Sequence, residues 1–130
     1  MAIELNNFTI IVNEASIKNN FMPNGEFKMN PTMQRKIGKI NDSDDNYFVE
    51  TSVEIHNTPE NPFPIELIAS IKGIFNIKGD DTEKIDEFLK VQGFQMVFPH
   101  LRALVANMTA NCMMPIILLP IVYANQFIDK

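Results

Sequence analysis

The 130-residue sequence contains 45% hydrophobic and 21% charged side chains, a composition that excludes an intrinsically disordered chain. It has 16 acidic and 11 basic residues, and the net charge of −5 argues against a nucleic-acid-binding protein because phosphate backbones require clustered cations. A single cysteine and the lack of a basic segment before an N-terminal apolar run indicate neither a disulfide scaffold nor a signal peptide. We therefore expect one cytoplasmic domain over residues 1–130.

Four segments predict β-strands, at residues 7–17, 26–40, 46–57 and 62–77. The third alternates most regularly, with one side formed by Tyr47, Val49, Thr51, Val53 and Ile55. Such alternation is typical of a half-buried antiparallel strand. In the second segment Pro31 removes a backbone donor, so we expect an edge strand or a bulge there. The nearby cations are expected on a solvated strand face: Lys28, Arg35, Lys36 and Lys39.

The fourth predicted strand has apolar residues on both faces. Ile68 and Ile74 fall on the side that also carries Glu66, Ser70 and Lys72. An apolar patch on a face that should contact water indicates an interaction surface. Ile68 and Ile74 are therefore candidate contacts between subunits of an oligomer.

After Gly79 the apolar pattern changes from the period of a strand to that of a helix. Either Asp80 or Thr82 is expected to cap a first helix, which Gly93 interrupts. A second helix follows, in which Pro99 is expected to lie near the first turn. Its single apolar face contains Val97, Leu101, Leu104, Val105, Met108 and Cys112. Strands followed by helices predict an α+β fold in which C-terminal helices cover a four-stranded antiparallel sheet.

The sequence lacks the residue patterns of a catalytic or metal site. His56 and His100 are its only histidines, and no spacing of a zinc site or of a phosphate-binding glycine loop occurs. Cys112 lies on the apolar side of its helix and is expected to be a buried, inert thiol. We expect neither an enzyme nor a metal or cofactor site.

The C-terminal segment is unusually apolar, because residues 112–123 carry no charged side chain. It is too short to cross a bilayer, which takes about 20 residues, and Pro115 and Pro120 exclude a straight helix. The chain also has eight methionines, some outside the regular core pattern. Methionine either fills gaps in a core or forms surfaces that accept many apolar shapes, and the composition leaves both possible.

Three motifs in the last 65 residues resemble the SecB family of protein-export chaperones. The family has a strand ending in Gly-Ile-Phe-x-Ile, which Gly73, Ile74, Phe75 and Ile77 match. Its helix opening Phe-Pro-x-x-Arg is matched by Phe98, Pro99 and Arg102. Its proline-containing loop is matched by Pro115, Leu118, Pro120, Ile121 and Tyr123. The resemblance is specific over residues 65–127 and architectural before them.

This resemblance implies a crossover between the first two strands, assembly as a homodimer or homotetramer, and binding of unfolded or pre-secretory polypeptides without nucleotide. It also implies that the proline-containing tail helps to wall an apolar groove. The residues expected to contact a client are Phe21, Met22, Phe27, Met113, Met114, Pro115, Ile117, Leu119 and Tyr123. Each of them is also a candidate for the core. Arg102 is expected to fix the helix or a subunit contact.

The sequence differs from the export chaperones at the position through which they dock on the SecA motor. A glutamate on the fourth strand contributes to that docking, and the matching position here is Ile68. Docking on SecA is therefore not expected. The first hypothesis is a holdase for non-native chains, and the alternative is a module dedicated to one partner, such as an antitoxin, a phage protein or a host protein.

Overall fold

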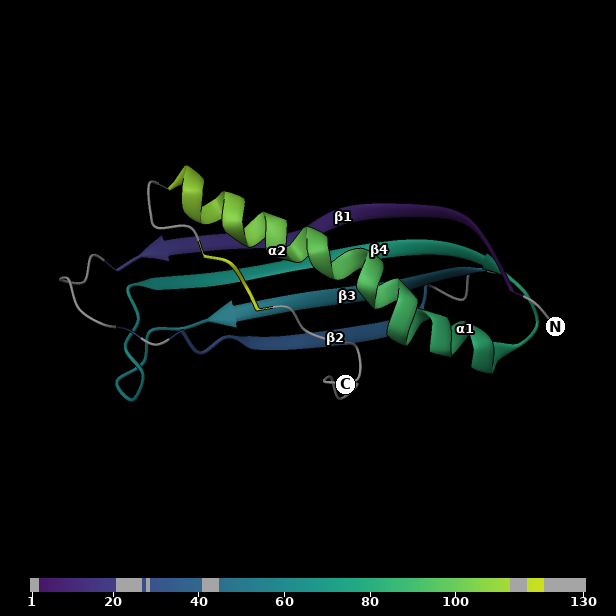
Figure 1. Ribbon diagram of the computed structural model, residues 1–130, viewed down its shortest axis with the longest axis horizontal. Coiled ribbons are helices and arrows are strands. Elements are labelled where there is room, and N and C mark those ends of the chain that lie inside the picture. The colour runs from purple at the N-terminus through teal and green to yellow at the C-terminus, as the bar shows by residue number, and fades with distance from the viewer. Residues whose placement is uncertain (1–2, 21–26, 28, 41–44, 113–116, 121–130) are drawn as a thin grey trace.

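The computed structural model describes residues 3–20, 27, 29–40, 45–112 and 117–120. Its strands are β1 (Glu4–Asn19), β2 (Thr32–Lys39), β3 (Asn46–Ile55) and β4 (Ile65–Lys78). All neighbours in the sheet are antiparallel, in the order β1-β4-β3-β2 (Figure 1). The chain therefore crosses from one edge of the sheet to the other between β1 and β2. This confirms the predicted α+β fold and its crossover.

The helical part contains two α-helices joined by a π-helical turn. It consists of α1 (Thr82–Phe88), a π-helical turn η1 (Leu89–Gly93) and α2 (Phe94–Asn111). The α1 cap is Asp81, one residue from either predicted cap, and its side chain accepts a hydrogen bond from the Lys84 backbone nitrogen at 3.2 Å. The interruption predicted at Gly93 is present as this π-helical turn, which ends at Gly93 and separates α1 from α2 without a break in the helical backbone. Gly93 lies in the turn and lets the helix approach β3, since a Cβ atom there would lie 3.2 Å from Val49 Cγ2.

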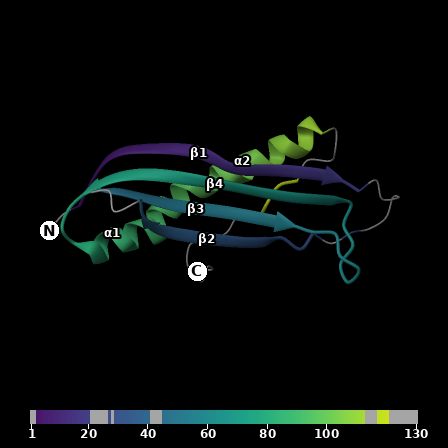
Figure 2. The same cartoon turned by 180° about the vertical axis from the view of Figure 1, so that it is seen from behind.

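Both helices lie on one face of the sheet and cross it obliquely (Figures 1 and 2). α1 lies by the ends of β2 and β3, and α2 runs over β4 toward β1. The predicted alternation in β3 is confirmed, and its helix-facing side chains belong to the core. Other core residues come from β4 and the helices, including Leu67, Phe75, Phe94, Val97, Leu101 and Val105. Within the described residues, no helix is long and apolar enough to cross a membrane.

Pro31 lies directly before β2, which begins at Thr32, and β2 is an edge strand, as predicted. Two other local predictions were wrong. Pro99 lies in the interior of α2, since α1, η1 and α2 form one continuous helical segment. Cys112 is exposed rather than buried, and it lies just beyond the end of α2 at Asn111.

Candidate polypeptide-binding surface

A row of apolar side chains follows edge strand β2 on the helix-facing side of the sheet. Met33 and Ile37 pair in register with Val53 and Val49, which are core residues of β3. Phe27 and Met29 precede β2 and, like Met33 and Ile37, are partly buried against the core. We call Phe27, Met29, Met33 and Ile37 the β2 apolar strip. α2 packs on β4 and β3 and reaches β1, so β2 lies at the edge of the helical layer (Figure 1).

Residues 117–120 lie on the same side of the sheet and run from the end of α2 toward β3 (yellow in Figure 1). Two hydrogen bonds attach this tail segment to α2. Arg102 Nε donates to the Leu119 carbonyl oxygen at 2.9 Å, and the Ile117 backbone nitrogen donates to Thr109 Oγ1 at 3.0 Å. Thr109 Oγ1 also donates to carbonyls of its own helix. The tail segment is therefore held as an extended strip beside the sheet, with no helix of its own.

The structure places the predicted client contacts in different environments. Phe27 lies in the β2 apolar strip, and Ile117 is partly buried against the core. Leu119 is only 1% exposed and belongs to the core, which is the alternative that the sequence left open for it. The Leu119 carbonyl oxygen accepts a hydrogen bond from Arg102, whereas the neighbouring Leu118 side chain is 67% exposed. The other predicted client contacts lie outside the described residues: Phe21, Met22, Met113, Met114, Pro115 and Tyr123.

Arg35 was predicted on a solvated face, and this was wrong. The side chain is 4% exposed, and its Nη1 donates to the Lys90 carbonyl oxygen at 2.8 Å. The guanidinium carbon lies 5.8 Å from the ring centre of Phe94. Arg35 shares its strand parity with Met33 and Ile37, so the sequence held a signal that it faces the helices. Arg35 therefore joins the edge strand to the π-helical turn.

The opposite face of the sheet carries no helix in the described part of the chain (Figure 2). Ile68 and Ile74 lie there, half-buried, and Ile68 is opposite Glu54 of β3 and Ser16 of β1. His56 is exposed, as predicted, and its Nε2 lies 3.0 Å from Glu54 Oε1. No group of three or more metal-binding side chains occurs among the described residues.

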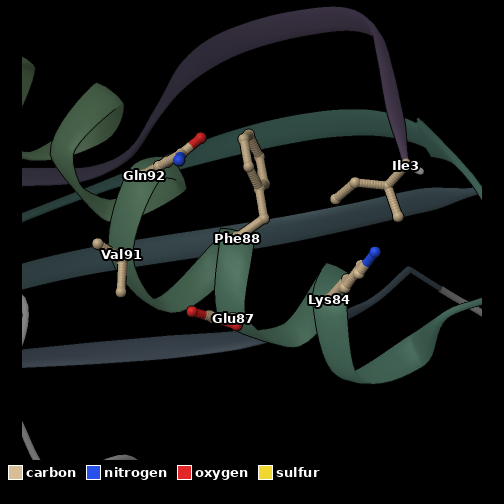
Figure 3. A pocket seen from close by; sticks show the side chains of 6 residues that line it. All are labelled: Ile3, Lys84, Glu87, Phe88, Val91 and Gln92. Atoms are coloured by element: carbon tan, nitrogen blue, oxygen red, sulfur yellow. The ribbon is translucent and has the colours of Figure 1, made fainter. Parts of the chain in front are cut away.

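A pocket of about 320 Å³ lies between the start of β1 and the helical layer (Figure 3). Ile3 and Phe88 flank the pocket, and Val91 lies in the next helical turn. Lys84, Glu87 and Gln92 provide its polar lining. The Phe88 ring packs edge-on against Phe75, with ring centres 5.8 Å apart. Of the predicted client contacts that the structure describes, namely Phe27, Ile117 and Leu119, none lines this pocket.

The family model described as preprotein translocase subunit SecB matches residues 7–130. The chain belongs to the SecB family. A solved SecB-like chaperone, Rv1957 of Mycobacterium tuberculosis in complex with a ChAD peptide from the HigA1 antitoxin, has the same fold. The TM-score is 0.74 at 12% identity, and the match covers 92% of this chain and 90% of Rv1957.

A curated relative of this SecB-family chain comes from Methanocaldococcus jannaschii. It is the uncharacterized protein MJ0357, which is 26% identical over 98 residues. The match covers 73% of this chain but 62% of MJ0357, so the archaeal protein has additional sequence.

Proposed function

We propose that this SecB-family protein is an ATP-independent cytoplasmic chaperone that holds unfolded or non-native polypeptides on the β2 apolar strip. The observation that carries the proposal is the strip itself, a row of partly open Phe, Met and Ile side chains beside an edge strand. Family membership and the peptide bound to the structural neighbour Rv1957 support it.

The side chains of the strip suit a partner without a fixed shape. Burial of apolar surface contributes about 25 cal/mol per Å², whatever the sequence that supplies it. Methionine adapts to many partners because its unbranched side chain has three rotatable bonds. A non-native chain exposes such apolar surface, whereas a folded protein has buried most of it. This chemistry favours broad binding of unfolded chains.

The tail segment is proposed to form a wall of the binding surface. Its attachment by Arg102 and Thr109 keeps it extended, and a pre-ordered wall lowers the entropic cost of binding. Met113, Met114, Pro115 and Tyr123 stay predicted client contacts on this side. Phe21 and Met22 stay predicted contacts on the crossover side.

A second candidate function is a module dedicated to one partner, such as an antitoxin, a phage protein or a host protein. Ile68 favours this alternative, because an apolar residue occupies the position where the export chaperones carry a glutamate for SecA docking. The antitoxin peptide on Rv1957 is an example of such a partner within the same fold. We therefore do not include SecA among the proposed partners.

We also propose that the chain forms a homodimer or homotetramer. Leu5 and Val12 on the helix-facing side of β1 are exposed, Val12 by 55%, and Val91 of η1 is 42% exposed. Together with the pocket beside Phe88, they form an apolar surface at the β1 edge. The sequence also predicted subunit contacts at Ile68, Ile74 and Arg102, and these residues stay candidates.

The proposed client surface is tested by binding of a fluorescently labelled, permanently unfolded protein, measured by anisotropy. The double variant Met29→Gln and Met33→Gln should weaken binding about tenfold or more, because both side chains lose apolar contacts. Phe48→Gln is a control on the open face, where we expect unchanged affinity. Equal affinity of all three proteins would place the client surface elsewhere, provided that their circular dichroism spectra agree.

A further inference from the structure

Edge strand β2 offers backbone hydrogen-bonding groups in addition to the apolar strip. β2 pairs with β3 on one side only, and it is the last strand in the sheet order. In a strand, successive residues direct their N–H and C=O groups to opposite sides, so alternate residues of β2 face away from β3. In the part of the chain that the structure describes, no strand lies beyond β2. Such an edge is a template for an added strand.

The two edges of the sheet differ in charge. β2 contains Arg35, Lys36 and Lys39 and no acidic residue, although the whole chain carries a net charge of −5. β1, the other edge, contains Glu4 and Glu14 against one Lys18. The β2 edge is therefore the one that complements an acidic segment.

The three cations of β2 differ in accessibility. Arg35 is buried and bonded to Lys90, whereas Lys36 and Lys39 are exposed. Lys36 lies on the open face, in register with Glu50 of β3. Lys39 lies on the helix-facing side, with its Nζ 5.9 Å from the ring centre of Tyr47. An added strand would pair with the side of β2 that faces away from β3. Lys36 is the cation of β2 that its side chains would meet on the open face of the sheet.

We propose that β2 binds clients by strand addition, and that it selects extended segments in which apolar and acidic side chains alternate. This inference rests on the proposed function and names its client class. The apolar side chains would continue the row of Met33 and Ile37, and the acidic ones would lie on the open face near Lys36. Directly opposite side chains of paired strands lie about 5 Å apart, close enough for both contacts. Pro31, which has no N–H, marks one end of the added strand.

The test uses an acetylated ten-residue peptide that alternates Glu with Leu, Val and Phe, and a set of copies that are N-methylated at one residue each. N-methylation removes a backbone donor and blocks pairing on that side of the strand. We expect affinity to fall about tenfold at every second residue and to change little at the residues between. The peptide residues at which N-methylation weakens binding should all be acidic or all be apolar. Side-chain direction and N–H direction both alternate with a period of two residues along a strand.

Charge selection is tested with the same peptide and its counterpart carrying Lys in place of Glu. Lys36→Glu should weaken binding of the acidic peptide about fivefold and strengthen binding of the basic one. The control is Lys78→Glu, which changes the net charge equally at the end of β4. It should leave the ratio of the two affinities unchanged. A ratio that moves equally in both variants would show a nonspecific effect of charge and overturn the selection.

The outcomes separate this inference from the proposed function. Binding of unfolded proteins without any alternating N-methyl effect would overturn strand addition and leave the holdase intact. Preference of the unmodified protein for the basic peptide would overturn the acidic client class. Failure to bind both peptides and every unfolded protein would instead reject the proposed function itself.

Discussion

Arg35 joins β2 to the helical layer through interactions that include a hydrogen bond to the Lys90 carbonyl and a contact with the Phe94 ring. A π-helical turn changes the partner of its backbone carbonyls, and the Lys90 carbonyl accepts from Arg35 at 2.8 Å. Arg35→Met should lower the free energy of unfolding by about 1.5–3 kcal/mol, because a hydrogen bond from a charged donor is lost in a buried place. Urea denaturation measures this loss.

The matched variant Arg35→Lys separates charge from geometry. Lysine keeps the positive charge but lacks the planar group that reaches the carbonyl and stacks on Phe94. We expect Arg35→Lys to lose most of the same stability, and hydrogen exchange at residues 89–93 to accelerate in both variants. If Arg35→Met were as stable as the wild type, with unchanged exchange, Arg35 would not hold the turn.

Gly73 is the point where α2 lies directly on β4. A Cβ atom at this position would collide with Val97 Cγ2 and would lie 3.1 Å from ring atoms of Phe8 and Phe75. Gly73→Ala should therefore destabilise the fold by about 1–3 kcal/mol, as expected for overpacking of a core. Gly38→Ala is the control. Its Cβ would meet the ring of Phe48, which is half-buried on the open face and lies outside the packed core, so the loss should be smaller. Comparable losses in the two variants would contradict the account of Gly73.

At the scale of the element, the tail segment depends on the hydroxyl of Thr109. This side chain is buried, accepts from the Ile117 nitrogen and donates to α2. Thr109→Val keeps the volume but leaves the Ile117 N–H without its acceptor, at a cost of about 1–3 kcal/mol. We expect faster hydrogen exchange at residues 117–119 and weaker client binding, because the proposed wall is no longer held.

Thr109→Ser keeps the hydroxyl and serves as the control for the tail segment. It should retain slow exchange at Ile117 and near-normal client binding. Release of the tail in Thr109→Val without any change in client affinity would remove the tail segment from the proposed binding surface.

The sheet could be predicted from the sequence because its strands carry local signals. The alternation of Val49, Val53 and Ile55 identified β3 and its buried face. The π-helical turn could not be predicted in this way. It depends on Arg35, which lies 55 residues before the carbonyl that it binds, and on close approach of Gly93 to β3. The burial of Leu119 could not be predicted either, since an apolar tail gives no sign of which of its side chains packs inward.

At the scale of the whole molecule, the β1 edge and the open face are competing subunit contacts. If Val12 and Val91 form the contact, Val12→Asp combined with Val91→Asp should shift the mass in light scattering toward the monomer, because each buries a charge against the partner. Ile68→Asp combined with Ile74→Asp should leave the mass unchanged. The reverse pattern would assign the contact to the open face, as the sequence predicted.

Above all, we propose that the protein holds non-native chains without nucleotide. The most direct test of this claim is the spontaneous refolding rate of a slow-folding model protein, measured with and without an equimolar amount of this protein. We predict that refolding slows or stops, and that the Met29→Gln, Met33→Gln variant restores much of the rate. Unchanged refolding of several such proteins would contradict the claim and favour a single dedicated partner.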